Sequence, residues 1–411
     1  MQRVLILGAG TAGTMAANKL RDKLDDSYEI TIVDSDDTHY YQPGFLFIPF
    51  DMYGVSDVVK PKRDFIPRGV TYINGAISEL LPDDNIVRLG DGTTLEYDHL
   101  IIATGTHPEP SETPGLDSEE YGRTVHDFYT LDGAVALRDA LAGFTSGRLV
   151  LNLIEMPIKC PVAPLEFAFL AEAHFTERGI RDDIEIVYVT PMSGAFTKPV
   201  AARHLGDMFE SRGIAIEPDF YLERVDSGAR RLVSYDEREV DYDLLVTIPL
   251  NMGAAFVGKA GLGDELNHVK VDHFTFQSPD HPNIFALGDA AALPTSKAGS
   301  VAHFAMETFV PNFLQYLEGH PMTSRFDGHA NCYIESGYGK ALLIDFNYDT
   351  EPLPGKYPLP GIGPFALLKE SEMNHWGKLM FKWMYWHMLL AGKDIPVPAH
   401  MTLAGKDRSA T

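Results

Sequence analysis

The two cysteines of the chain are the residues best suited to redox chemistry. Cys160 and Cys332 are the only thiols among the 411 residues, and each lies in a stretch bounded by proline or glycine. A pair of thiols can be oxidised to a disulfide, which a sulfur nucleophile then opens by exchange. We expect Cys160 at the start of a helix over 164–173, where the helix dipole and the neighbouring Lys159 lower a thiol pKa. The alternative is that both cysteines are unreactive thiols of the core.

Two further side chains are candidates for moving protons near these thiols. Glu166 closely follows Cys160, and if it is buried its raised pKa suits a base that accepts a proton from a substrate. His204, which follows Lys198 and Arg203, is a candidate proton carrier. The alternatives are a first-turn acid stabilised by the helix dipole for Glu166, and a solvent-exposed helix face for His204.

The N-terminal stretch has the pattern of a dinucleotide-binding loop. An apolar strand over 4–7 runs into Gly-x-Gly-x-x-Gly, a helical pattern follows, and a second strand over 30–33 ends at an acid. The first glycine allows a tight turn, the second lets the backbone approach a pyrophosphate, and the third lets the helix pack against the strand. The helix N-terminus attracts the phosphates, and an acid about 20 residues later accepts from a ribose hydroxyl. The predicted contacts are Gly8, Gly10, Thr11, Ala12, Gly13 and Asp34.

Two later strand ends indicate that the dinucleotide is FAD. The strand over 97–103 runs into Thr-Gly, and the strand over 283–287 runs into Gly-Asp-Ala. The Asp289 carboxylate can accept hydrogen bonds from the ribityl hydroxyls of a flavin, which a nicotinamide dinucleotide lacks. Lys297 follows and would place a positive charge near the pyrimidine side of the flavin ring. The other predicted cofactor contacts are Gln42, Ala76, Ile77, Thr104, Gly105, Gly288 and Gly299.

A second α/β unit lies between these motifs, and its first loop lacks the features that bind a nucleotide. Strands are predicted over 148–154 and 184–189. The loop over 155–166 has no glycine and contains three prolines, which remove N–H donors and fix φ. It therefore cannot cradle a pyrophosphate in the usual way, and Cys160 stands where the phosphates would lie.

These elements predict an α/β fold with two Rossmann-like dinucleotide-binding domains, three-layered with β-meanders, and a C-terminal helical region that associates with a membrane. The predicted FAD-binding domain comprises 1–110 and 281–325. The second Rossmann-like domain comprises 111–280, lacks the NAD(P) glycine loop and carries Cys160. Residues 326–411 form the C-terminal region, with the second cysteine and interfacial helices.

The strand-end motifs together resemble the pyridine nucleotide–disulfide oxidoreductases and their relatives over roughly the first three quarters of the chain. Over essentially its whole length, the sequence resembles the sulfide:quinone oxidoreductases of that group. This resemblance rests on the Gly8–Gly13 loop, the Cys160–Glu166 loop, Gly288-Asp289 with Leu293–Lys297, Cys332 with its following strand, and the tail over 384–390.

The resemblance implies a redox relay in which the two cysteines flank the flavin and oxidise hydrogen sulfide, with Cys332 facing the flavin and Cys160 carrying sulfur. Electrons would then pass to a quinone. Many members have a third cysteine, where this chain has only His-Asp-Phe over 126–128, so attachment of the flavin through that thiol is ruled out. The resemblance places the quinone near Tyr333, Phe346 and Lys378.

Residues 365–400 indicate contact with a membrane surface. All three tryptophans lie within 376–386, and the apolar run that they begin is too short to span a bilayer. Tryptophan favours the bilayer interface, and four lysines add local positive charge to an acidic chain. We therefore expect a peripheral, monotopic membrane protein without a signal peptide. The alternative is a helix of the core or of a homo-oligomer interface.

The formal net charge of −24 argues against nucleic acid as a partner, and we predict no metal site. Three other functions remain open. A type II NADH:quinone oxidoreductase is disfavoured by the missing second glycine loop. The flavin subunit of a flavocytochrome sulfide dehydrogenase is disfavoured by the missing signal peptide and by the tryptophan-rich tail. A non-catalytic flavin-binding redox sensor would not need that tail.

Overall fold

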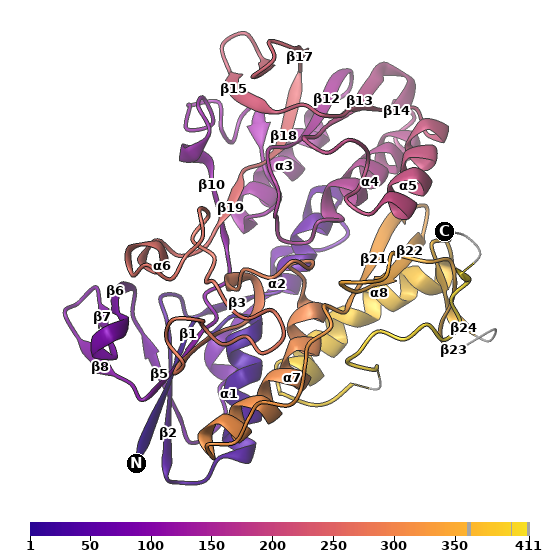
Figure 1. Ribbon diagram of the computed structural model, residues 1–411. Coiled ribbons are helices and arrows are strands. Elements are labelled where there is room, and N and C mark those ends of the chain that lie inside the picture. Colours follow the sequence, from indigo (N-terminus) through magenta and orange to yellow (C-terminus); the bar gives the residue numbers. More distant parts are fainter. Residues whose placement is uncertain (360–362, 396, 409–411) are drawn as a thin grey trace.

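A parallel sheet that begins at the N-terminus forms the base of the molecule in Figure 1, a computed structural model that describes residues 1–359, 363–395 and 397–408. The strand order is β20-β9-β1-β2-β5. The strands are β1 (Gln2–Leu7), β2 (Tyr28–Asp34), β5 (Val70–Asn74), β9 (His99–Ile102) and β20 (Ile284–Ala286). The chain thus returns to this sheet only after a second sheet has formed.

Helices and a meander cover the two faces of this sheet, because its strands alternate their side chains between the faces. Ile6 of β1 packs into one core with helices α1 (Thr11–Lys23) and α7 (Gly299–Leu317), which lie side by side in Figure 1. Leu5 packs into a separate core with the meander. The meander consists of β6 (Ile77–Leu81), β7 (Ile86–Leu89) and β8 (Thr94–Glu96).

The second parallel sheet has the order β11-β18-β12-β13-β14 and occupies the upper part of Figure 1. Its strands are β11 (Val125–His126), β12 (Gly147–Leu153), β13 (Ile184–Val189), β14 (Ile214–Glu217) and β18 (Leu244–Ile248). Its helices are α3 (Leu131–Gly143), α4 (Ala163–Glu177) and α5 (Pro199–Ser211), and its meander consists of β15 (Leu222–Asp226), β16 (Arg231–Ser234) and β17 (Glu239–Asp241). Helix α4 therefore begins one residue before the predicted helix and extends four residues beyond it.

Two chain crossings join the sheets, and they pair as the antiparallel ribbon of β10 (His107–Glu109) and β19 (Leu250–Met252). The smaller elements are β3 (Thr38–Tyr40), β4 (Val59–Pro61), α2 (Val55–Val58), α6 (Ala255–Lys259) and the 3₁₀ helix η1 (Gln42–Phe50). The α/β fold and both meanders agree with the sequence prediction, and the predicted domain boundaries stay predictions.

The C-terminal part adds a four-stranded sheet of order β21-β22-β24-β23. Its strands are β21 (Ala330–Gly337), β22 (Lys340–Phe346), β23 (Gly355–Leu359) and β24 (Gly363–Leu367). Helix α8 (Glu372–Met384), drawn in yellow in Figure 1, packs on this sheet and continues into one π-helical turn, η7 (Tyr385–Leu389). Strand β21, which carries Cys332, packs against α4 of the second sheet.

The structure corrects the expectation that the whole tryptophan-rich tail contacts a membrane surface. Trp386 is only 6% exposed and stacks on Phe65, and Leu389 and Leu390 are fully buried. The π-helical turn therefore belongs to the core, because its side chains pack against the N-terminal domain and do not form an exposed helical face. Among the described residues, no helix has the length and apolar character needed to cross a bilayer.

The packing of the N-terminal loop predicts different effects for two of its glycines. A Cβ atom on Gly13 would lie 1.8 Å from the carbonyl oxygen of Gly8, whereas a Cβ atom on Gly10 meets nothing within 4 Å. We expect G13A to lower the free energy of unfolding of the cofactor-free protein by at least about 2 kcal/mol, because the helix must shift. The matched control G10A should keep most of the wild-type free energy of unfolding. It should instead bind less FAD, as measured by the absorbance of the purified protein. Equal stability of G13A and wild type in urea denaturation would contradict this assignment.

Candidate functional site

A cavity of about 570 Å³ lies where the two parallel sheets and the C-terminal part meet. This volume is within the range that small-molecule and cofactor sites occupy. The glycine loop before α1, the ends of β2 and β9, the turn after β20, both cysteines and α8 line it. The predicted site residues that line it are Gly8, Gly10, Thr11, Ala12, Asp34, Gln42, Thr104, Gly105, Cys160, Glu166, Gly288, Asp289, Lys297, Gly299, Cys332, Tyr333 and Lys378.

The glycine loop fits the phosphates of a dinucleotide. Gly8 has φ +97°, and a Cβ atom there would lie 2.5 Å from the carbonyl oxygen of Ala103. Gly10 is the N-cap residue of α1, and no side chain caps this helix. The first N–H groups of α1 and its positive dipole end therefore face the cavity beside a residue with open space at its Cβ position.

Asp34 sits at the end of β2, where the sequence predicts a ribose acceptor, and it also holds the loop. Its Oδ2 accepts from the N–H of Ala9 at 2.6 Å, and its Oδ1 pairs with Nζ of Lys62 at 2.9 Å. Lys62 is 4% exposed and lines the same cavity. Sequence reasoning missed Lys62 because it lies in a short 3₁₀ turn with no local motif.

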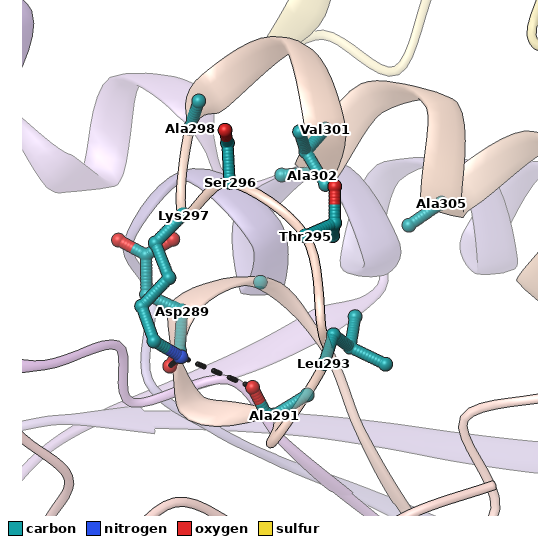
Figure 2. A pocket seen from close by; sticks show the side chains of 11 residues that line it. Asp289, Ala291, Leu293, Thr295, Ser296, Lys297, Ala298, Val301, Ala302 and Ala305 are labelled. Atoms are coloured by element: carbon teal, nitrogen blue, oxygen red, sulfur yellow. Dashed lines mark hydrogen bonds between the residues drawn. The ribbon is translucent and has the colours of Figure 1, made fainter. Parts of the chain in front are cut away.

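Asp289 and Lys297 both line the cavity, and the charge of each acts on the other. Nζ of Lys297 donates to the carbonyl oxygens of Asp289 at 2.6 Å and Ala291 at 3.1 Å. Figure 2 shows the Lys297 side chain extending past Asp289 to the turn that carries it. Burial raises the pKa of Asp289, while the charges of Lys297 and Lys159 oppose this shift. The ammonium of Lys297 is thus directed to the backbone of the turn, and its predicted place beside the flavin ring stays a prediction.

Hydrogen bonds hold the cysteine-bearing loop that follows β12 in place beside the cavity. The N–H of Cys160 donates to the carbonyl oxygen of Lys297 at 2.7 Å, and the N–H of Lys159 donates to Oδ1 of Asn251 at 3.0 Å. Nζ of Lys159 donates to Oε1 of Gln42 at 3.0 Å. These bonds join the loop to β19, to η1 and to the segment that follows β20, so three separate elements fix its position beside the cavity.

The expected lowering of the Cys160 pKa is wrong. Cys160 is partly exposed where it lines the cavity, but the surrounding protein desolvates its thiol and raises the pKa of Cys160 to about 12, with the charge of Glu166 adding to the shift. Desolvation also lowers the pKa of Lys159 to about 8, and its ammonium points to Gln42. Loss of water around the thiolate therefore outweighs the helix dipole. Burial likewise raises the pKa of Cys332, and both cysteines are free thiols.

A buried ion pair stands beside the thiols. Glu166, in the first turn of α4, is fully buried; it pairs with Nζ of Lys378 and accepts from the N–H of Glu335 at 2.7 Å. Nζ of Lys378 also donates to the carbonyl oxygen of Tyr333 at 3.2 Å. Burial raises the pKa of Glu166, and the charge of Lys378 opposes this shift. Lys378 therefore reaches into the cavity instead of extending along the surface of α8.

The structure does not bring every predicted site residue to the cavity. The carbonyl oxygen of Ala76 accepts from Gly90, and Ile77 begins the meander. His204 is half-buried on the separate helix α5, and Phe346 is buried at the end of β22 under the ammonium of Lys198. Gly13 packs against the loop behind the cavity. The residues outside the lining are Gly13, Ala76, Ile77, His204 and Phe346.

Sequence reasoning also missed a link between the nucleotide loop and the C-terminal part. The hydroxyl of Tyr385 lies 2.7 Å from Oγ1 of Thr11 and 2.7 Å from Nε2 of His39. Burial lowers the pKa of His39 to about 4, which keeps the imidazole neutral. No signal in the sequence relates these residues, because they lie at opposite ends of the chain.

Comparison with known proteins shows which proteins this chain resembles. The pattern of the pyridine nucleotide-disulphide oxidoreductase family matches residues 2–150. Mitochondrial sulfide:quinone oxidoreductases of Dictyostelium discoideum and Mus musculus are each 26% identical, covering 95% of this chain and 86% of the relatives. The predicted resemblance to sulfide:quinone oxidoreductases is confirmed. The prediction of FAD as the cofactor is confirmed with it.

A solved structure extends the likeness to the whole fold. The sulfide:quinone oxidoreductase of the hyperthermophilic bacterium Aquifex aeolicus superposes with a TM-score of 0.79 at 20% identity, covering 96% of this chain and 92% of that one. A ferredoxin reductase of Rhodopseudomonas palustris superposes with a lower TM-score of 0.66 at 19% identity, covering 87% and 86%. The chain therefore has the α/β fold of this class of oxidoreductases.

The buried ion pair predicts a large loss of stability when one partner is removed. K378M leaves the Glu166 carboxylate buried without its cation, so the free energy of unfolding should fall by roughly 3–5 kcal/mol. The matched control K382M breaks the exposed pair of Lys382 with Asp57 on the same helix, and it should cost less than about 1 kcal/mol. Urea denaturation measures both. The double variant E166Q/K378M should regain stability, and equal losses for K378M and K382M would contradict the assignment.

Proposed function

We propose that this protein is an FAD-dependent enzyme that oxidises hydrogen sulfide and passes the electrons to a quinone. The observation that most supports this proposal is the glycine-free loop of the second sheet. The loop is hydrogen-bonded to the backbone of Lys297, and it places Cys160 in the same cavity as Cys332. A loop in this position leaves no phosphate cradle for a nicotinamide cofactor. Electrons therefore enter from sulfur and not from a hydride donor.

The two thiols supply the sulfur chemistry in this proposal. In the oxidised enzyme they are joined as a disulfide or through bridging sulfur, and hydrosulfide attacks one sulfur atom. The attacked S–S bond breaks, a new S–S bond forms as a persulfide on Cys160, and Cys332 leaves as a thiolate. Lys378, whose charge reaches both thiols, stabilises that thiolate in surroundings where burial disfavours it. FAD, when bound, supplies a two-electron acceptor beside these sulfur atoms.

Lys378 and Tyr333 are the residues that this proposal assigns to the quinone. Both line the cavity, and an ammonium group donates a strong hydrogen bond to a quinone oxygen that becomes negative on reduction. Phe346, which the resemblance to sulfide:quinone oxidoreductases places in the same site, lies outside the cavity lining. It packs instead in the core at the end of β22. Glu166 holds the Lys378 ammonium in place and acts as the nearby base.

The exposed face of α8 supports association with a membrane surface. Four apolar side chains point to solvent, with exposures of 49% for Met373, 64% for Trp376, 53% for Met380 and 57% for Trp383. Their spacing of three and four residues places them on one side of the helix. The opposite side carries Lys378 to the cavity. One helix would thus contact both the lipid and the site that receives a lipid-soluble quinone.

The proposed substrate is tested by the visible absorbance of the flavin. Anaerobic sulfide should bleach the wild-type band, and decylubiquinone should restore it, because electrons enter through the thiols. C160S and C332S should each slow the bleaching by at least about a hundredfold. M156L, a change in the same loop that keeps both thiols, is the matched control.

Two outcomes of this assay would overturn the proposal. Bleaching of the wild-type flavin by NADH would indicate an NADH:quinone oxidoreductase. Bleaching by neither donor would indicate a flavin-binding sensor.

The proposed membrane surface predicts a specific loss of lipid binding. W376S/W383S should weaken co-sedimentation with vesicles of mixed neutral and anionic phospholipid by at least about tenfold, since the exposed indole rings provide much of the apolar contact. Tyr235, 74% exposed in the turn after β16, provides the matched control Y235S, which should bind as wild type does. Unchanged binding, or a dimer in solution that depends on these tryptophans, would contradict a lipid surface.

A further inference from the structure

The buried ion pair is the inner end of a longer line of charged groups. Glu335 lies two residues beyond Tyr333 on β21, and its side chain is 1% exposed. Oε1 of Glu335 is 2.8 Å from Nδ1 of His375, whose side chain is 14% exposed on α8. The line runs from Cys160 in the cavity through Glu166, Lys378 and Glu335 to His375 at the surface.

The backbone of β21 and the charge of Lys378 connect the two halves of this line. The N–H of Glu335 donates to the same oxygen of Glu166 that pairs with Lys378. The charge of Lys378 acts on Glu166, on Glu335 and on both cysteines. The second carboxylate oxygens of Glu166 and Glu335 are buried and have no hydrogen-bond partner among the described residues, so each carboxylate retains a site that can accept a proton.

The charged groups of this line have a net negative charge that one added proton would neutralise. The carboxylates of Glu166 and Glu335 and the ammonium of Lys378 sum to one negative charge in a region away from bulk water. Burial raises the pKa of both Glu166 and Glu335, with the charge of Lys378 opposing each shift. Uptake of a single proton makes the line neutral, and desolvation favours that form.

The reaction needs such a supply of protons. Oxidation of hydrosulfide to zero-valent sulfur releases one proton and two electrons. Reduction of a quinone to a quinol takes up two protons and two electrons. Each turnover therefore draws one net proton from solvent, in addition to the proton that hydrosulfide releases, and this proton must reach a buried site.

We propose that His375 and Glu335 carry this proton from the surface of α8 to the Glu166–Lys378 pair, which delivers it to the reduced quinone. The imidazole takes up a proton from solvent on Nε2 and releases one from Nδ1 to the Glu335 carboxylate. The carboxylate transfers it to the ion pair, and Lys378 donates to the quinone oxygen. This inference rests on the proposed function, and it assigns a role to two residues that act through Lys378.

Groups on several elements influence whether the Glu335 side chain is ionised. Glu166 acts on it from α4, and Lys378 and His375 act on it from α8. Tyr53 lies near it in the loop after η1: burial raises the pKa of Tyr53, and the charges of Asp57 and Glu335 add to that shift. Lys378 and His375 favour the ionised form of Glu335, whereas Glu166 disfavours it. Protonation of this line is therefore favoured as pH falls, and proton supply weakens as pH rises.

Separate half-reactions test this proposal. In anaerobic stopped-flow, E335Q and H375Q should be bleached by sulfide within about twofold of the wild-type rate, and their reoxidation by decylubiquinone should slow at least about tenfold. Wild-type reoxidation should slow as pH rises, and E335Q should lose that dependence because its amide cannot carry the proton. The matched control E372Q removes an exposed carboxylate from the first turn of α8 and should leave both half-reactions unchanged.

A rescue experiment keeps the test independent of the stability of E335Q. H375A opens a partly exposed position, and added imidazole should restore its reoxidation rate without changing the rate of sulfide bleaching. Wild-type rates and pH profiles for E335Q and H375Q would overturn the proposal, as would slow H375A that imidazole does not restore. Failure of sulfide to bleach the wild-type flavin would instead overturn the proposed function itself.

Discussion

The structure around the cavity depends on the burial of one ion pair, Glu166 with Lys378. Each ion loses its water, which costs several kcal/mol, and only close pairing with further hydrogen bonds offsets that cost. Three separate parts of the chain supply these groups: α4 supplies the carboxylate, α8 supplies the ammonium, and β21 supplies the N–H of Glu335 and the carbonyl of Tyr333. The pair therefore requires the second sheet, the C-terminal sheet and α8 to meet at one point.

The same junction places both thiols. Cys160 stands just before α4 and Cys332 lies on β21, so the elements that hold the ion pair also bring both sulfur atoms to the cavity. The nucleotide loop is joined to this junction through Tyr385, whose hydroxyl contacts Thr11. The nucleotide loop, the elements that carry the thiols and α8 therefore pack together at one junction.

Desolvation accounts for the main difference between expectation and structure. Local reasoning gives Cys160 a helix N-terminus and a lysine neighbour, both of which favour a thiolate. The folded chain surrounds the thiol with protein and directs the lysine to Gln42, so the neutral thiol is favoured. A similar effect divides the tail: Trp376 and Trp383 remain exposed on α8, whereas Trp386 is enclosed by the N-terminal domain.

The sequence by itself determined the features that neighbouring residues specify. The Gly8–Gly13 loop, the Asp289 turn and the proline-stiffened loop around Cys160 are local, because spacing along the backbone decides where N–H groups and glycines fall. Only the tertiary structure decided which distant groups share the cavity: Lys62 with Asp34, Lys378 with Glu166, and the two thiols. Side-chain pairing and burial arise from packing between elements, and no local pattern records which helix will lie beside which strand.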